Sequence, residues 1–415
     1  MKKLIVSLLV VLLFTVGAFA ANQLEIFSWW TGGGEEAGLL ALIEELTAQY
    51  PDLEVINATV AGGAGSNAKA VLKTRMLGGN PPDSFQVHAG EELTDTYVVT
   101  GKMEPITKYL AEWGYLDKFP KDIMDICSYE GEVYSIPVNV HRGNVVFYNK
   151  AIAEEIGMTS EPNTWEEFFY YLEKAKDAGY IGLSLGDKNK WTATHLFEDI
   201  VLSQFGAYKY TKLWNGQQSF DSVALGDSLQ ILKDLIPHFN KDHSSLTWQD
   251  ASRLVFEKKA LFNVMGDWAE GYFKEMGWTP GEEFGWFAVP ETGNAFMVVS
   301  DTFGLPKGSP NAENALKWLK FIGSVKAQDI FNPIKGSIPA RVDADKSKYD
   351  VYLQWAMNDF SNLALAPSIA HGSAAPGAFA GALDDAINGF LANANIENTM
   401  DDILWAAEDE GYNIN

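Results

Sequence analysis

The chain has 415 residues, 47% of them apolar, and a formal net charge of −24 at pH 7. A chain of this length can bury a large core and divide into about two domains, and its single cysteine, Cys127, excludes an internal disulfide. The acidic surface would repel the phosphates of nucleic acids and anionic lipids, so neither is expected as a partner.

The first 20 residues have the features of an export signal. Lys2 and Lys3 form a basic start, residues 4–16 form an apolar run, and Ala18-Phe19-Ala20 is a cleavage site of small residues. We therefore predict cleavage after Ala20 and export to a bacterial periplasm. No later segment resembles a membrane span, so the mature chain is not expected to insert into the bilayer.

Strand and helix patterns alternate along the rest of the chain. The spacing of apolar residues predicts a strand at 24–27, a helix from Leu39 to Tyr50, a β-rich stretch at 53–60, a helix at 67–77 and a strand at 84–88. The alternation returns with a helix at 164–178, a strand at 180–185 and a helix at 312–322. This order predicts an α/β fold with parallel strands and right-handed crossovers.

The first predicted strand runs into two adjacent tryptophans, Trp29 and Trp30. Ligands of open α/β sheets bind beyond the carboxyl ends of the strands, and tryptophan is rarely buried completely. We therefore expect both indoles to face a ligand rather than the core.

Several motifs resemble a known family. Four motifs are similar in order and spacing to the family 1 extracellular solute-binding proteins of ABC sugar importers: Ile26–Trp30, Gly78–Asp83, Ser135–Pro137 followed by Val145–Lys150, and Met265–Trp268. Within that family a second set resembles the bacterial glucose/galactose-binding branch: Gln86–Gly90, Asn139–Arg142, Leu246–Gln249 and Phe331–Ser337.

The resemblance implies the two-lobed periplasmic binding protein fold of type II, an α/β architecture with the ligand cleft between the lobes. Hinge segments would cross between the lobes near Val145, Pro290 and Arg341. Lobe 1 would contain residues 21–145 and 290–341, and lobe 2 residues 146–289 and 342–415, with a helical C-terminal part. The implied partners are a monosaccharide and the permease subunits of an ABC transporter, and the protein is expected to be a monomer.

The resemblance also implies a set of ligand-binding residues, carried over position by position: Trp29, Trp30, Glu35, Gln86, His88, His141, Trp248, Trp268, Asp301, Lys335 and His371. These residue types suit a sugar, because a pyranose offers an apolar face to an aromatic ring and a rim of hydroxyls to polar groups. Glu36 is an alternative to Glu35, since this loop carries an extra residue. Other tryptophans, among them Trp113, Trp165, Trp191 and Trp318, are interpreted as packing residues.

The implied function is capture of glucose and/or galactose for an ABC importer, with no catalytic residue, cofactor or metal site. His238 and His243 lack the helix-face spacing of a zinc pair. Two alternatives remain open. A secreted glycoside-acting enzyme would need two facing carboxyl groups, for which Asp267, Asp301 and Glu35 are available. A sugar-sensing, receptor-type binding protein would share the same site.

Overall fold

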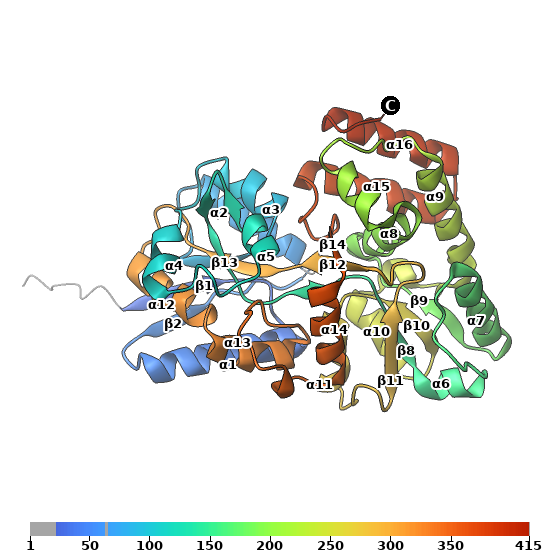
Figure 1. Cartoon of the computed structure of the whole chain (residues 1–415), viewed down its shortest axis with the longest axis horizontal. Coiled ribbons are helices and arrows are strands. Elements are labelled where there is room, and N and C mark those ends of the chain that lie inside the picture. Colours follow the sequence, from blue (N-terminus) through green and yellow to red (C-terminus); the bar gives the residue numbers. More distant parts are fainter. Residues whose placement is uncertain (1–21, 63–64, 415) are drawn as a thin grey trace, which may run out of the picture.

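The computed structural model describes residues 22–62 and 65–414. The predicted export signal, residues 1–20, and its cleavage site lie outside these residues. The described chain forms two α/β lobes side by side, with β12 (Ala295–Val299), β14 (Ala364–Pro367) and α14 (Val351–Asn362) between them (Figure 1). The two-lobed fold class expected from the sequence is confirmed.

The first lobe is built on a five-stranded sheet. Its strands lie in the order β2 (Glu54–Asn57), β1 (Gln23–Phe27), β3 (Ser84–His88), β13 (Asp301–Gly304) and β6 (Ser135–Pro137). Strand β1 pairs in parallel with β2 and β3, as the strand and helix order predicts. Strand β13 runs antiparallel to both β3 and β6, because it enters from the other lobe. The parallel pairing predicted for the first three strands is confirmed, and the sequence analysis made no prediction for β13.

Helices flank this first sheet. They are α1 (Gly33–Gln49), α2 (Ser66–Leu77), α3 (Glu91–Leu93) with the π-helical turn Thr94–Val98, α4 (Thr107–Trp113), α5 (Lys121–Ile126), α12 (Ala312–Ile322) and α13 (Val325–Lys335). A small ribbon, β4 (Ser128–Tyr129) with β5 (Glu132–Val133), follows α5. Helix α13 begins where the hydroxyl of Ser324 accepts a hydrogen bond from the amide of Ala327, a side-chain cap typical of helix starts.

The second lobe has a four-stranded mixed sheet in the order β11 (Phe284–Ala288), β8 (Val145–Asn149), β10 (Ala260–Val264) and β9 (Ile181–Ser184). Its helices are α6 (Lys150–Glu155), α7 (Trp165–Asp177), α8 (Trp191–Leu213), α9 (Val223–Leu235), α10 (Trp248–Phe256), α11 (Trp268–Glu275), α15 (Gly377–Asn393) and α16 (Ile396–Asp409). Short 3-10 turns occupy Ile236–His238, His243–Ser245 and Lys346–Lys348. No helix within residues 22–62 and 65–414 has the length and apolar character needed to cross a membrane.

The chain passes between the two sheets three times. It leaves the first sheet after β6, runs through β7 (His141–Arg142) and enters the second sheet at β8. It returns from β11 through β12 to β13, and leaves again after α13 toward α14 and β14. Strands β14, β12 and β7 form a small sheet of their own in these crossings. The lobe limits expected near 145, 290 and 341 stay a prediction.

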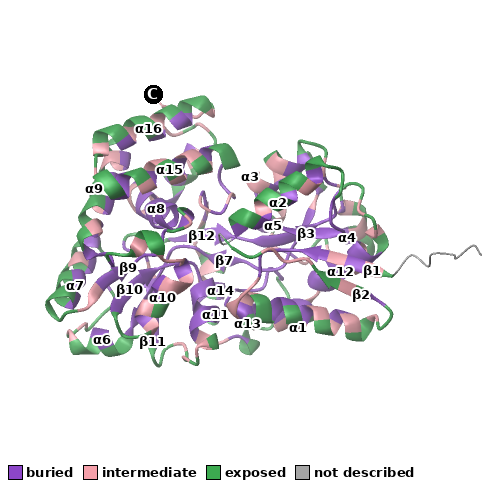
Figure 2. Ribbon diagram, turned by 180° about the vertical axis from the view of Figure 1, so that it is seen from behind, coloured by how far each residue is buried: buried purple, intermediate pink, exposed green. Residues whose placement is uncertain are grey.

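The central strands of both lobes, and strand β12 between them, are buried. Every residue of β3, β8, β10 and β12 is buried, and Figure 2 shows the strands as the most buried part of both lobes, with exposed residues on the outer helices. The two lobes therefore have well-packed interiors, and the groups between them are held from both sides.

The lobes touch closely where α11 meets the end of α13. Helix α11 carries Gly271, and a Cβ atom at this position would lie 2.4 Å from the carbonyl oxygen of Lys335. The ammonium of Lys274, one turn further along α11, donates to the carbonyl of Pro333 at 2.8 Å. Only a glycine allows the two backbones to approach this closely.

We predict that Gly271→Ala lowers the free energy of unfolding by about 1–3 kcal/mol, because the new methyl group overpacks the contact between α11 and α13. Urea unfolding of the full chain measures the change. Gly226→Ala in α9 is the matched control, since its Cβ would meet nothing within 4 Å and alanine favours a helix by about 1 kcal/mol. Equal behaviour of the two variants would contradict a tight contact between the lobes.

Candidate functional site

A cavity of about 600 Å³ lies between the lobes. Its wall takes side chains from the end of β1, from α1, α2, β3 and β13 of the first lobe, and from the starts of α8, α10 and α11 of the second. The loop between β14 and α15 closes one side with Ile369, Ala370 and His371. Neither lobe alone surrounds the cavity.

Four tryptophans give the cavity its aromatic walls. Trp29 follows β1, whereas Trp191, Trp248 and Trp268 are the first residues of α8, α10 and α11. The start of α10 is fixed by a capping box in which Thr247 and Asp250 exchange hydrogen bonds. The ring of Trp268 lies 5.4 Å from that of His141 and 4.9 Å from that of His371, measured between centroids. The sequence thus places each of the three second-lobe indoles at a helix end that meets the cavity.

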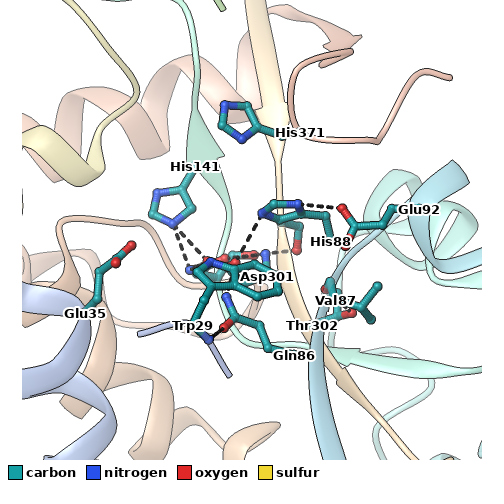
Figure 3. Close-up of polar contacts among 12 residues, drawn as sticks. Trp29, Glu35, Gln86, Val87, His88, Glu92, His141, Asp301, Thr302 and His371 are labelled. Atoms are coloured by element: carbon teal, nitrogen blue, oxygen red, sulfur yellow. Dashed lines mark hydrogen bonds and ion pairs between the residues drawn. The ribbon is translucent and has the colours of Figure 1, made fainter. Parts of the chain in front are cut away.

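Asp301, the first residue of β13, is the most strongly held carboxylate of the site. Its oxygens accept hydrogen bonds from the amides of Gln86 at 2.8 Å and Asn139 at 2.9 Å, and lie 3.2 Å from Nε2 of His141 (Figure 3). Burial alone would raise the pKa of Asp301, but the hydrogen bond from His141 and the nearby charges of Lys335, His141 and His88 hold that pKa well below its usual range. Asp301 therefore stays an ionised acceptor.

His141 lies between two carboxylates. Its Nε2 atom faces Asp301, and its Nδ1 atom makes a short contact with Asp267, which also accepts a hydrogen bond from the backbone amide of Arg142 at 3.0 Å. Burial would lower the pKa of His141, but the charge of Asp267 and the hydrogen bonds to both carboxylates raise it. Both ring nitrogens thus face a carboxylate, and the imidazole joins β13 to the residue before α11.

A second polar group lies beside Trp29. Glu92 in α3 accepts from Lys69 at 2.6 Å and is 3.0 Å from Nδ1 of His88, whose ring lies 5.0 Å from that of Trp29. Burial would raise the pKa of Glu92, but the charges of Lys69 and His88 and their hydrogen bonds lower it to about 2. His88 is therefore fixed at the cavity wall by an ionised carboxylate.

The floor of the cavity contains an ion pair between α1 and α13. Lys335, the last residue of α13, is 2% exposed, and its Nζ atom lies 2.8 Å from a carboxylate oxygen of Glu35. The same ammonium lies 5.9 Å from the ring centroid of Trp268. Glu35 lines the cavity, while Glu36 is exposed and does not, and contact of Glu35 with a ligand stays a prediction.

Comparison with known proteins identifies the family. The family model described as bacterial extracellular solute-binding protein matches residues 31–329. The chain belongs to this family. The relationship expected from the sequence motifs is confirmed.

Relatives match over almost the whole chain. An uncharacterized ABC transporter extracellular-binding protein of Pyrococcus horikoshii is 39% identical, covering 93% of this chain and 87% of the relative. A probable sugar-binding periplasmic protein of Mesorhizobium japonicum is 33% identical, covering 94% of each. Among solved structures, the solute receptor AcbH, described as having an exclusive preference for β-D-galactopyranose, superposes with a TM-score of 0.82 at 20% identity over 93% of this chain and 97% of its own. At that identity the likeness shows the fold.

The structure brings nine of the eleven predicted ligand residues to the cavity wall: Trp29, Glu35, His88, His141, Trp248, Trp268, Asp301, Lys335 and His371. Gln86 does not line the cavity. It accepts from the backbone amide of Trp29 at 3.1 Å and donates to Asp301, so it positions both. Their contact with a ligand stays a prediction.

The expectation that Trp30 faces a ligand disagrees with its position. Trp30 is fully buried, and its ring packs 4.6 Å from Phe331 and 5.5 Å from Phe303. Neighbouring residues of an extended segment point to opposite sides, so Trp29 can reach the cavity only if Trp30 faces the core.

Sequence reasoning also missed cavity residues. Trp191, interpreted as a packing residue, lines the cavity, as do Lys69, Glu92 and Gln249. A signal was available for Trp191, because it follows the loop after a strand and begins a helix, the same setting as Trp268. Lys69 and Glu92 carry no comparable local signal, since their role depends on how α2 and α3 pack against β3.

One group among the described residues brings metal-ligating atoms together. Atoms of His195, Glu198 and His371 lie within 4.8 Å of one another, and all three residues are buried. Glu198 already accepts hydrogen bonds from the hydroxyl of Ser368 and from the amides of Ile369 and Ala370. These three hydrogen bonds satisfy the oxygens of the buried carboxylate without a metal ion. The absence of a metal site stays an expectation.

We predict that Glu92 makes the protein sensitive to acid. Its pKa falls from 4.5 to about 2 on folding, so its contribution to stability is complete above pH 4.5 and is lost as the pH falls toward 2. The contribution is at most about 3 kcal/mol. Urea unfolding at pH 6 and pH 3 should show a smaller loss of stability for Glu92→Gln than for the unchanged protein.

The control for this prediction is Glu282→Gln, an exposed side chain outside the cavity. This variant should lose as much stability between the two pH values as the unchanged protein. An identical loss in Glu92→Gln would show that the contact of Glu92 with Lys69 and His88 does not persist in solution.

Proposed function

We propose that the protein captures a monosaccharide, glucose and/or galactose, in the periplasm and delivers it to the permease subunits of an ABC importer. The observation that carries this proposal is the combination, around one cavity, of four indole rings with fixed and mostly ion-paired polar side chains. The relatives named as sugar-binding periplasmic proteins support the sugar, and the galactopyranose receptor of the same fold supports a single ring.

The chemistry of the wall fits a pyranose. Indole rings can stack on the apolar C–H face of the sugar, and the charged Asp301 and Lys335 can accept from and donate to its hydroxyls. His88 and His141 add groups whose orientation is fixed by Glu92, Asp267 and Asp301. Such a wall recognises hydroxyl orientation with little reorganisation on binding.

The positions of the carboxylates support recognition rather than glycoside hydrolysis. Hydrolysis requires two carboxyl groups that face each other across the substrate, one of them protonated. Burial raises the pKa of Asp267, but Asp267 does not line the cavity and is engaged by His141 and Arg142. Asp301 and Glu35 line the cavity, where Asp301 contacts His141 and Glu35 pairs with Lys335.

Capture would use both lobes. Trp29 and Asp301 belong to the first lobe, whereas Trp248, Trp268 and His371 belong to the second, so a bound ring contacts the complete set only when the lobes meet. A ligand that binds this closed arrangement better than an open one shifts the population toward it. The closed form would then be the one that docks on the permease.

We predict that isothermal calorimetry on the full chain detects binding of glucose or galactose, with weaker binding of maltose and mannose. The reason is that fixed polar groups distinguish single hydroxyl orientations. Product analysis of the same samples should show no release of reducing sugar from a glycoside. Hydrolysis of a glycoside would contradict the proposal, and so would the absence of binding to every sugar tested.

We predict that Trp268→Ala weakens sugar binding at least about 30-fold, which corresponds to about 2 kcal/mol, because a buried indole at the centre of a site contributes both area and ring geometry. Calorimetry with the best-bound sugar measures the loss. Trp405→Ala is the control, since Trp405 is 70% exposed on α16 and lies outside the cavity. If both variants bind normally, Trp268 is a packing residue.

A further inference from the structure

His371 lines the cavity, and one edge of its ring contacts His195. Its Nε2 atom lies 3.3 Å from Nδ1 of His195, and its backbone amide donates to the hydroxyl of Ser368 at 3.2 Å. Its Nδ1 atom has no hydrogen-bond partner among residues 22–62 and 65–414. The ring of His371 packs edge-on against that of His88, with 5.6 Å between ring centroids (Figure 3).

His195 is fully buried in α8 and does not line the cavity. Its Nδ1 atom faces an oxygen of Glu198 at 3.5 Å, and its Nε2 atom faces an oxygen of Asp199 at 3.9 Å. Both carboxyl groups are fully buried, and neither oxygen of Asp199 has a hydrogen-bond partner within the described residues. Burial raises the pKa of Asp199 to about 8, so Asp199 can itself carry the proton between its carboxyl group and Nε2. Glu198 accepts three hydrogen bonds and would repel a lone pair on Nδ1, so the surroundings favour a proton on Nδ1 of His195.

The electrostatics of the two rings differ in direction. Burial lowers the pKa of His195, but the hydrogen bond to Glu198 and the charges of Asp199 and Glu198 raise it above the usual value. Burial, together with the neighbouring charges of His195, His88 and Lys69, lowers the pKa of His371 well below the usual value. His371 is therefore neutral and carries a single ring proton.

We propose that His195 is a positioning residue that fixes His371 as the Nδ1–H tautomer, so that His371 presents a hydrogen-bond donor to the cavity. Two N–H groups cannot face each other at 3.3 Å, and His195 supplies the proton in this contact. Nε2 of His371 must then be the acceptor, which leaves the proton on Nδ1. A ligand hydroxyl would then accept a hydrogen bond from Nδ1–H of His371 with its oxygen.

The loop that carries His371 is fixed by the same cluster. Glu198 accepts from the hydroxyl of Ser368 at 2.7 Å and from the amides of Ile369 and Ala370 at 2.6 and 3.0 Å. One turn of α8 therefore sets both the position of the His371 backbone and the proton of its ring. The consequence for ligand recognition rests on the proposed sugar-binding function, whereas the tautomer itself does not.

The tautomer is tested on the unchanged protein without sugar by nitrogen-15 NMR of its histidine rings. The chain has six histidines, and the His371→Asn variant assigns the signals of His371. We expect Nδ1 of His371 at the chemical shift of a protonated nitrogen and Nε2 at that of an unprotonated one. The opposite assignment, or a doubly protonated ring at pH 7, would overturn the proposal.

Affinity variants test the role of His195. His195→Ala removes the donor, so His371 should exchange between tautomers and sugar affinity should fall about tenfold. His195→Asn places an amide N–H near the former Nδ1 position and should restore most of the affinity. His238→Ala is the matched control, a buried histidine outside the cavity, and should bind as the unchanged protein does.

The outcomes separate this inference from the proposed function. If the unchanged protein binds no sugar while His371 is the Nδ1–H tautomer, only the proposed function fails. If sugar binds and His371 carries its proton on Nε2, or if His195→Asn binds no better than His195→Ala, the positioning role fails. A stoichiometric divalent metal found by mass spectrometry of the purified protein would also overturn it, since Nε2 of His371 would then be a metal ligand.

Discussion

The arrangement of the site depends on one imidazole held between two carboxylates. His141 contacts Asp301, which opens β13 in the first lobe, and Asp267, which precedes α11 in the second. Trp268 follows Asp267 directly, so the ring that bounds the cavity moves with the carboxylate that His141 holds. A single buried imidazole thus connects the aromatic wall of one lobe to the acceptor of the other.

This connection is stable because the buried charges are compensated. Removing an ion from water costs several kcal/mol unless an opposite charge and hydrogen bonds replace the lost water. Asp301 has both the adjacent imidazole of His141 and two amide donors, Gln86 and Asn139, while Lys335 has Glu35. A ligand therefore meets groups that are already oriented, and much of the energetic cost of ordering them is met during folding rather than during binding.

Much of this could be read from the sequence, and the failures have physical reasons. The position of Trp29 after a predicted strand placed it at the cavity, because ligands of open α/β sheets bind beyond the carboxyl ends of the strands, and the family resemblance added His88 and Asp301. The alternation of side chains in an extended segment should have assigned Trp30 to the core. The role of His195 could not be predicted, since it depends on the packing of α8 against a loop about 170 residues later.

The contacts on either side of the cavity explain how two lobes can enclose a small ligand. The amide of Glu92 donates to the carbonyl of Gly372 at 2.8 Å, and a Cβ at Gly90 would lie 2.5 Å from the carbonyl of Ser373. Gly271 permits an equally close approach of backbones where α11 meets α13. Contacts of this kind form only at one separation of the lobes, so a ligand that fills the cavity without holding the lobes apart gains them. Discrimination between ligands therefore arises from the fit of the whole closed arrangement as well as from any single contact.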